Sequence, residues 1–137
     1  MRLTKQTNYA IRLLMYCAAN PSTLSNVAQI AKTYNVSQLF LFKVLYPLVE
    51  AGFVSTVRGR GGGIKLARPA SEISVAEVVK VTEENFSMAE CFDNENVECP
   101  LIDACGLTTT FKEALAAFFD VLQKTSIADL QRPTYQA

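Results

Sequence analysis

The sequence predicts a mainly α-helical protein with one small β-hairpin: a winged helix-turn-helix domain followed by a long C-terminal dimerisation helix. Three observations predict this fold class. Apolar residues recur at helical spacing in three consecutive segments of the first half, a glycine-rich turn between two short apolar runs follows them, and another apolar stripe lies near the end of the 137-residue chain. Three helices followed by a hairpin is the element order of a winged helix-turn-helix.

The first three predicted helices cover residues 5–19, 26–34 and 38–51, and each has apolar residues at i, i+3 and i+4. We expect Ser25 to cap the second helix and Ser37 the third, because a serine hydroxyl accepts a hydrogen bond from a backbone N–H that lacks a partner at a helix start. Pro47 has no amide proton, so it predicts a kink within the third helix.

The hairpin is predicted from residues 53–57 and 64–67, which read as two short strands joined by the segment RGRGGG. Arg58 and Arg60 at its tip suit the narrow, electronegative minor groove of DNA, and the glycines let the backbone approach closely. An ordinary flexible hairpin is the alternative. A nucleotide-binding P-loop is disfavoured because no Lys-Ser/Thr pair and no helix follow the glycines.

The third helix predicts a DNA-reading face near its N-terminal end. Four residues lie off its buried stripe, namely Gln38, Leu39, Phe42 and Lys43. This part of the helix enters the major groove in such folds, where Gln38 can pair with adenine and Lys43 with guanine or phosphate. Leu39 and Phe42 can pack on thymine methyl groups. The alternative is that Leu39 and Phe42 belong to the core.

The net charge of the chain changes sign near residues 68–70. Residues 1–70 carry nine Lys and Arg and one acid, a net charge of +8, whereas residues 71–137 carry four Lys and Arg and twelve acids, a net charge of −8. This asymmetry predicts a polyanion-binding domain over residues 1–70, whose DNA contacts we extend to Arg2, Lys5 and Ser37, and a different role for residues 71–137. A surface that is lopsided by chance is the alternative.

Residues 71–137 predict two helices around an irregular segment. Ser74 and Glu77 form a capping box that opens a helix to about Glu84. Residues 85–106 are irregular and acidic and contain three of the four cysteines. The last helix, about 107–124, has a Phe- and Leu-rich face larger than a small domain needs to cover itself, so we expect it to pair with a second copy. Folding back on its own core is the alternative.

Three cysteines with the spacing Cys91-x7-Cys99-x5-Cys105 are the candidate metal ligands. We expect a cytoplasmic protein, because no secretion signal and no membrane-spanning apolar window are present, and cytosolic thiols rarely form disulfides. Three thiolates can hold an iron–sulfur cluster and leave one iron without a cysteine ligand. The spacing alone is a weak signal, since it lacks the Cys-x-x-Cys of structural zinc sites. Cys17 lies on the apolar stripe of the first helix and is expected in the core.

Several function classes are excluded or disfavoured. The sequence has no histidine, which excludes imidazole-activated nucleophiles and His-ligated zinc or haem. No flavin or nicotinamide fingerprint is present, so an oxidoreductase is disfavoured and we predict that the protein is not an enzyme. A DNA-binding module that zinc stabilises, without sensing, is an alternative from another class.

Three stretches together resemble the Rrf2 family of bacterial winged-helix regulators, and most closely its RirA-like branch of rhizobial iron regulators. They are the opening MRLTKQTNYA, the wing VSTVRGRGGG and the cysteine-containing residues 88–107, and the closing SIADL at residues 126–130 fits as well. The resemblance covers essentially the whole chain, and the joint occurrence of this wing and this cysteine triplet is highly specific.

The resemblance implies a homodimer that binds palindromic double-stranded operator DNA and carries a cluster ligated by Cys91, Cys99 and Cys105 of each subunit. In the RirA-like branch the cluster is of the 4Fe–4S type, convertible to 2Fe–2S or lost to leave the apo-protein. The implied function is an iron-responsive repressor, with oxygen as a second signal, that leaves its operator when the cluster is lost. Nitric-oxide-sensing NsrR-like and cluster-assembly-sensing IscR-like repressors are the alternatives within the family.

Two departures from the family pattern concern the fourth cluster ligand. Some relatives use a histidine, which this chain lacks, and the NsrR-like branch uses an N-terminal acid where this chain has Asn8, a neutral amide. The candidates for the fourth ligand are therefore Asn8, an acid such as Asp93 or Glu95, solvent or a small thiol. Phe42 also stands where IscR-like members have a polar residue, which implies a different operator preference.

Overall fold

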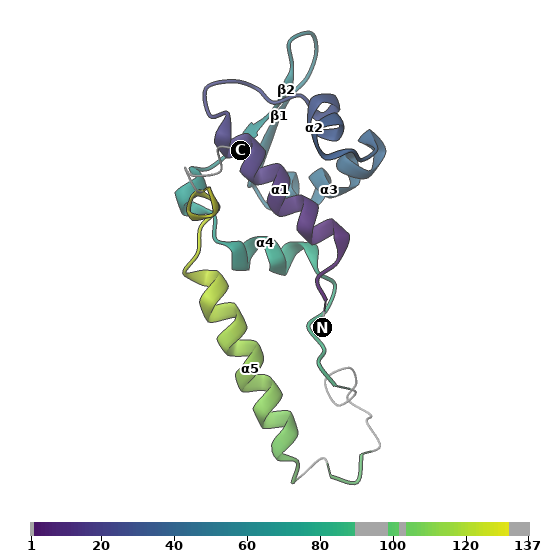
Figure 1. Ribbon diagram of the computed structural model, residues 1–137, viewed down its shortest axis with the longest axis vertical. Helices are drawn as coiled ribbons and strands as arrows, with labels where there is room; N and C mark the ends of the chain where they lie inside the picture. The colour runs from purple at the N-terminus through teal and green to yellow at the C-terminus, as the bar shows by residue number, and fades with distance from the viewer. Residues whose placement is uncertain (1, 90–98, 102–103, 132–137) are drawn as a thin grey trace.

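The computed structural model describes residues 2–89, 99–101 and 104–131, and it confirms a mainly α-helical chain with one antiparallel hairpin. Figure 1 shows the hairpin at one end of the long axis and the C-terminal helix at the other. The elements in chain order are α1 (Lys5–Ala19), α2 (Val27–Tyr34), α3 (Gln38–Glu50), β1 (Val54–Val57), β2 (Gly63–Leu66), η1 (Ala70–Glu72), α4 (Val75–Thr82), α5 (Gly106–Gln123) and η3 (Ala128–Leu130).

The starts of α2 and α3 are fixed by side-chain caps, one of which differs from the prediction. The Ser37 hydroxyl accepts a hydrogen bond from a backbone N–H in the first turn of α3 (3.1 Å), as predicted. The cap of α2 is Asn26, so the prediction of Ser25 is wrong. Ser25 instead pairs its backbone with Ile64 of β2 through two hydrogen bonds of 2.7 and 2.8 Å. The third helix continues through Pro47 to its end.

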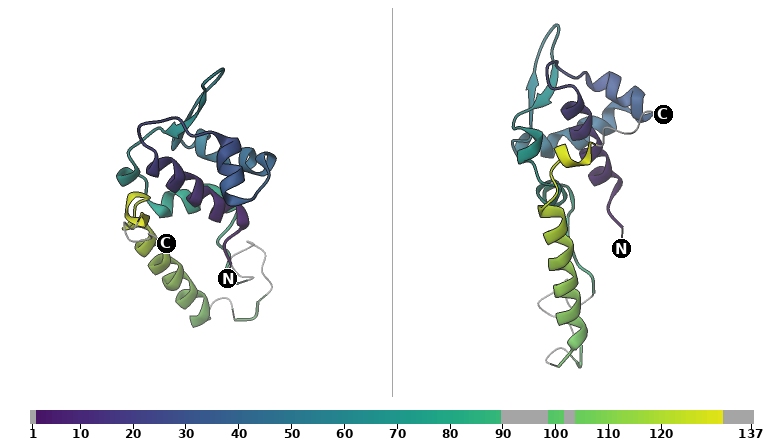
Figure 2. Two further views of the ribbon diagram at one scale, coloured as in Figure 1. Left: turned by 45° about the horizontal axis from the view of Figure 1, so that its top comes forward. Right: turned by 60° about the vertical axis from the view of Figure 1, so that its left-hand side comes forward.

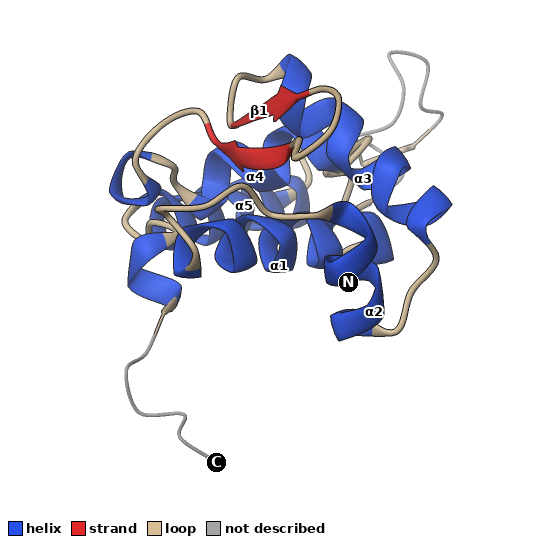
Figure 3. Ribbon diagram, turned by 90° about the horizontal axis from the view of Figure 1, so that it is seen from above, coloured by secondary structure: helices blue, strands red, loops and turns tan. Residues whose placement is uncertain are grey.

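The wing hairpin needs glycine in its turn for two different physical reasons. Strands β1 and β2 pair antiparallel (Figure 3). In this register Val57 lies opposite Gly63. Gly59 has a φ of +94°, a conformation that L side chains rarely adopt. At Gly62 a Cβ atom would lie 2.2 Å from the carbonyl oxygen of Val57, so any side chain there forces the turn apart. The glycine run is therefore a structural requirement of this wing.

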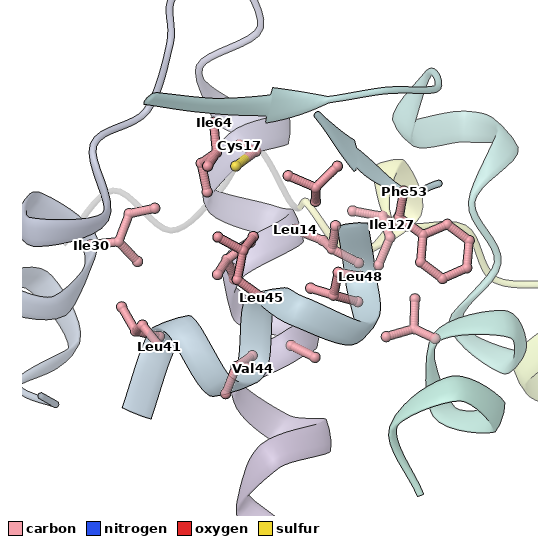
Figure 4. Packing of buried hydrophobic residues seen from close by; sticks show 14 of the residues in the cluster. Leu14, Cys17, Ile30, Leu41, Val44, Leu45, Leu48, Phe53, Ile64 and Ile127 are labelled. Atoms are coloured by element: carbon pink, nitrogen blue, oxygen red, sulfur yellow. The ribbon is translucent and has the colours of Figure 1, made fainter. Parts of the chain in front are cut away.

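The hydrophobic core joins residues from both sides of residue 70. Figure 4 shows Leu14 of α1, Leu48 of α3 and Phe53, which precedes β1, around Ile127, which follows α5. Ile73 and Val78 belong to the same cluster. Fully buried members include Leu13, Leu14, Ile30, Leu41, Val44, Leu48, Ile73, Val78 and Ile127. The predicted division of function between residues 1–70 and 71–137 stays a prediction, and the packing is shared between the two parts.

Helix α5 is attached to the rest of the chain mainly near its C-terminal end (Figure 2). Beyond that end, the N–H of Ile127 donates to the carbonyl oxygen of Ile73 (2.9 Å), and the N–H of Val75 donates to that of Thr125 (2.8 Å). No residue of α5 is fully buried within this chain, and Val121 is 65% exposed. Within the described ranges, none of the helices combines the length and the apolar character needed to cross a membrane.

Candidate nucleic-acid interface and cysteine site

The exposed face of α3 carries the residues predicted to read DNA. Leu39 is 82% exposed and Phe42 is 52% exposed. Gln38 and Lys43 are exposed beside them, while the opposite face of the helix supplies Leu41, Val44, Leu45 and Leu48 to the core. The prediction that Leu39 and Phe42 lie off the core is confirmed, and their contact with DNA remains a prediction. Two large apolar side chains on a solvent face point to a contact with another molecule.

Tyr46 extends this face by one turn and was missed by the sequence reasoning. It is 66% exposed and lies seven residues after Leu39 and four after Phe42, a spacing that could have identified it. Its hydroxyl donates a hydrogen bond to Glu50 Oε1 (2.9 Å). This hydrogen bond and the negative charge of Glu50 raise the pKa of Tyr46. The only acid of the first 70 residues is therefore partnered on α3 itself.

The cations of the first half are largely free of acidic partners. Arg58 and Arg60 are exposed at the turn of the wing. Among the residues that the structure describes, the one ion pair joins Arg68 to Glu77 (3.4 Å), and it lies away from the wing tip. The wing arginines and Lys43 thus present positive charge that no described carboxylate neutralises. Such charge is what a phosphate backbone or a narrow minor groove attracts.

An aromatic cluster at the junction of α1, α2 and α3 holds two further cations, and the sequence reasoning did not find it. Its members are Tyr9, Tyr16, Tyr34 and Phe40. Lys5 Nζ lies 4.9 Å from the centre of the Phe40 ring, and Arg12 Cζ lies 4.8 Å from that of Tyr9. These distances are within the range of cation–π attraction. The predicted DNA contact Lys5 is therefore held against the third residue of α3.

The cysteine site is described in part. Cys99 and Cys105 are free thiols of intermediate exposure, whereas Cys91, Asp93 and Glu95 lie outside the described residues. Cys105 is the N-cap of α5, and hydrogen bonds from the backbone N–H groups of Thr108 and Leu107 lower the pKa of its thiol. In the described part of the chain, no three Cys, Asp or Glu side chains converge on one metal position.

The chemistry of these thiols fits an iron–sulfur group, because iron is bound by thiolates and the start of α5 favours a thiolate at Cys105. Cys17 differs from Cys105 in its burial and in the direction in which its pKa is shifted. It is 2% exposed in the core, and burial raises its pKa to about 11, so the core prediction is confirmed. Asn8, a candidate fourth ligand, is exposed on α1 and donates its amide to the carbonyl oxygen of Thr4 (3.0 Å).

The pKa values predict an order of thiol reactivity in the metal-free protein. Cys105 should be alkylated by iodoacetamide with a midpoint below the ordinary thiol range, and Cys17 should resist alkylation up to about pH 10, because the thiolate is the nucleophile. Peptide mass spectrometry after short exposure at a series of pH values measures both. In urea the two thiols should converge. Equal midpoints for Cys105 in folded and urea-unfolded protein would contradict the helix-cap explanation.

The start of α1 is tied to the end of α4, from which the chain runs on to the cysteine segment. Glu83 Oε1 accepts hydrogen bonds from the N–H of Thr4 (2.7 Å) and from its hydroxyl (3.1 Å). The hydroxyls of Thr7 and Thr82 share a buried hydrogen bond of 2.8 Å beside them. Partial burial raises the pKa of Glu83, but the hydrogen bonds from Thr4 and Thr7 outweigh it, and the pKa lies below its ordinary value.

Comparison with known proteins gives one family match over most of the chain. The model of the Rrf2 family, described as "Iron-dependent Transcriptional regulator", matches residues 3–133. Protein aau3 of Rhizobium meliloti (strain 1021) is 62% identical over 130 residues, which is 95% of this chain and 84% of that protein. The HTH-type transcriptional regulator NsrR of Bacillus subtilis (strain 168) is 45% identical over 131 residues, which is 95% of this chain and 90% of that protein.

Solved structures share the fold. The oxidized form of CymR from Staphylococcus aureus superimposes with a TM-score of 0.77 at 26% identity, covering 98% of this chain and 100% of that one. An IscR from T. potens superimposes with a TM-score of 0.76 at 20% identity, covering 95% of this chain and 85% of that one, and at this identity the likeness concerns the fold alone.

Proposed function

Because the chain belongs to the Rrf2 family of transcriptional regulators, we propose that it is an iron-responsive repressor that binds operator DNA when an iron–sulfur cluster is bound to its cysteines. The family is described as transcriptional regulators and NsrR is named an HTH-type transcriptional regulator, so the prediction that the protein is a DNA-binding regulator and not an enzyme is confirmed. The iron signal, the 4Fe–4S cluster type and the RirA-like assignment are parts of our proposal.

The observation that carries the proposal is that the exposed cations of the wing and of α3 have no carboxylate partner among the described residues, while the same chain has a thiol, Cys105, at the N-cap position of α5. The exposed α3 face and the wing arginines suit duplex DNA, with the helix in the major groove and the wing in the minor groove. Phe42 and Leu39 favour thymine methyl groups over polar base edges. The protein would therefore prefer operators with thymines at the positions that α3 reaches.

We assign Cys91, Cys99 and Cys105 as the ligands of the cluster. When bound, the cluster would supply a site that iron loss, oxygen or nitric oxide can dismantle. The fourth ligand stays open between solvent, a small thiol, Asp93 or Glu95, and Asn8. Asn8 is a poor candidate within one subunit, because its amide already donates to the α1 start and a neutral amide binds iron weakly.

We propose that α5 pairs with α5 of a second copy. In the described chain its side chains are at most partly covered, and Leu107 and Val121 are more than half exposed. Pairing would bury this apolar surface and place two α3 helices on one face of the DNA, as a palindromic operator requires. Half-sites in such operators lie about 34 Å apart, so a small change in dimer geometry weakens binding at both half-sites.

Two connections give the cysteine segment influence over DNA binding in this proposal. Cys105 occupies the N-cap position of α5, so a cluster bound to its sulfur would be attached next to the first turn of the helix that we propose pairs with a second copy. Glu83 lies just before the other end of the segment and accepts a hydrogen bond from Thr4. In the sequence, Thr4 lies between Arg2 and Lys5, and we predict that both of these residues contact DNA. Ligand-controlled ordering of a segment between two such anchors is an established type of switch.

Anaerobic purification followed by native mass spectrometry and an operator gel shift tests this proposal. We expect a dimer with one cluster per subunit that binds a palindromic site tightly, and at least about fivefold weaker binding after treatment with an iron chelator, as expected for a typical allosteric coupling. A colourless protein with stoichiometric zinc, or equal affinity with and without chelator, would contradict it.

A nitric-oxide sensor of the NsrR kind is the second candidate function, because several relatives at 40–45% identity carry that name. The same gel shift separates the two signals. Release from the operator at a low ratio of chelator to cluster, with resistance to an equal ratio of nitric oxide, supports the iron signal. The reverse order of sensitivity supports the nitric-oxide signal.

A further inference from the structure

One face of α1 carries two cations and two aromatic side chains. Lys5, Tyr9, Arg12 and Tyr16 follow one another at helical spacing on the side away from the buried residues of that helix. The Tyr9 ring packs edge-to-face on Phe40 of α3 with centroids 5.4 Å apart, and on Tyr34 at the end of α2 at 6.3 Å. The Tyr34 hydroxyl donates a hydrogen bond to the carbonyl oxygen of Arg12 (3.1 Å). The aromatic cluster therefore connects α1 to both helices of the helix-turn-helix.

The second observation is that rings, not carboxylates, hold the two cations of this face. Lys5 Nζ is 4.9 Å from the Phe40 ring and 5.7 Å from the Tyr9 ring, and Arg12 Cζ is 4.8 Å from Tyr9. Neither cation has an ion-pair partner among the described residues. A ring orients a cation without cancelling its charge. The full positive charge of both residues thus stays available to an external anion.

The third observation is the place of this pair. Phe40 lies in the first turn of α3, two residues from exposed Phe42 and beside exposed Leu39. Figure 1 shows α2 and α3 lying beside α1, with the start of the chain running down and away from α2 and α3. The rims of a major groove are lined by phosphates. When a helix enters the groove, cations beside the start of that helix therefore lie near the phosphate backbone of the DNA.

We propose that Lys5 and Arg12 form a phosphate clamp that binds the DNA backbone at the rim of the groove entered by α3, with Tyr9 and Phe40 as positioning residues. The inference rests on the proposed DNA-binding function and assigns Arg12, Tyr9 and Phe40 a part in it. Phosphate contacts fix the orientation of a protein on the duplex and carry no sequence information. The clamp therefore contributes affinity to operator and non-operator DNA alike.

Binding measured as a function of salt tests the clamp directly. Fluorescence anisotropy gives the dissociation constant of a labelled operator and of a scrambled duplex at KCl concentrations from about 50 to about 300 mM, a range over which phosphate contacts change affinity steeply. Arg12→Gln and Lys5→Gln should each make the slope of log K against log salt less steep. The magnitude of the slope should fall by about 0.9 for every phosphate that is no longer neutralised, and each variant of a dimer loses two phosphate contacts. At physiological salt this corresponds to about fivefold weaker binding per phosphate, on both duplexes.

Matched variants separate charge from structure. Lys124→Gln removes the same charge from an exposed position at the end of α5 and should leave slope and affinity unchanged. Arg12→Lys keeps the charge and should restore the slope. Tyr9→Leu removes the ring and keeps both cations, so it should weaken binding while the slope stays near that of the unchanged protein.

The salt dependence of the variants distinguishes phosphate contacts from base contacts and from a structural effect. A double Lys5→Gln, Arg12→Gln variant that folds with an unchanged melting temperature and keeps the original slope overturns the clamp. A loss confined to the operator duplex overturns the assignment to phosphate, because it indicates base reading. If the unchanged protein shows no salt-dependent DNA binding, the proposed function fails first and the clamp fails with it.

Discussion

Cys105→Ser is expected to abolish cluster binding and to weaken operator binding of anaerobically prepared protein by about 5- to 150-fold, the usual range of an allosteric coupling. The hydroxyl of serine is a poor iron ligand, so the thiolate donor set loses one member. Folding should survive, because Cys105 is the N-cap of α5 and serine is among the preferred N-cap residues. The effect can therefore be attributed to the sulfur and not to a broken helix.

Absorption spectra and native mass spectra measure cluster binding, and anisotropy measures operator affinity. Cys99→Ser and Cys91→Ser should behave as Cys105→Ser does. Cys17→Ala is the matched control, since Cys17 is buried in the core and has no predicted role as a ligand. It should keep the cluster and lose only a modest amount of stability. Full operator affinity in the variants that lack the cluster would show that the cysteines do not control DNA binding.

The combined change Arg58→Ala and Arg60→Ala should weaken operator binding by at least about tenfold, with the largest loss on operators whose flanks have a narrow, A·T-rich minor groove. Both side chains are exposed at the wing tip and have no carboxylate partner in the described structure. Their removal takes away charge and groove contacts without touching the core. Melting temperature should therefore change little.

Gly62→Ala tests the shape of the wing while both arginines remain. A Cβ atom there would lie 2.2 Å from the Val57 carbonyl oxygen, so the turn must open and the arginines must move. We expect a loss of operator affinity similar to that of the double arginine variant. Gly106→Ala is the control, because a Cβ at that position meets no atom within 4 Å. Normal operator binding by Gly62→Ala would mean that the wing does not contact DNA.

The reading face of α3 could be predicted from the sequence because it depends on one helix and its own periodicity. Leu39 and Phe42 fall off the apolar stripe, and the structure leaves both exposed. Tyr46 has the same spacing, four residues after Phe42, but was not included in the predicted face. The capping box of Ser74 and Glu77 was predicted for a similar local reason: both of its hydrogen bonds lie within four residues.

The aromatic cluster and the Thr4–Glu83 link could not be predicted in this way. Each depends on the placement of α1 against another helix, with partners separated by 18 to 79 residues in sequence. The Ser25 cap failed for the same reason. Serine is a preferred residue at a helix start, but the backbone of Ser25 pairs with Ile64 of β2. The position of Ser25 therefore depends on where β2 lies, which the residues around Ser25 do not indicate.

By itself, the sequence determined the helices, the hairpin, the glycines of the wing, the exposed face of α3 and the cysteine triplet. These features follow from backbone sterics, caps and periodicity over a few residues. Only the tertiary structure decided that Ile127 enters the core shared with α1 and α3, that α5 is held at its C-terminal end, and that rings orient Lys5 and Arg12. Burial is a competition among all the apolar surfaces of the chain, and its outcome is set by contacts between residues far apart in sequence.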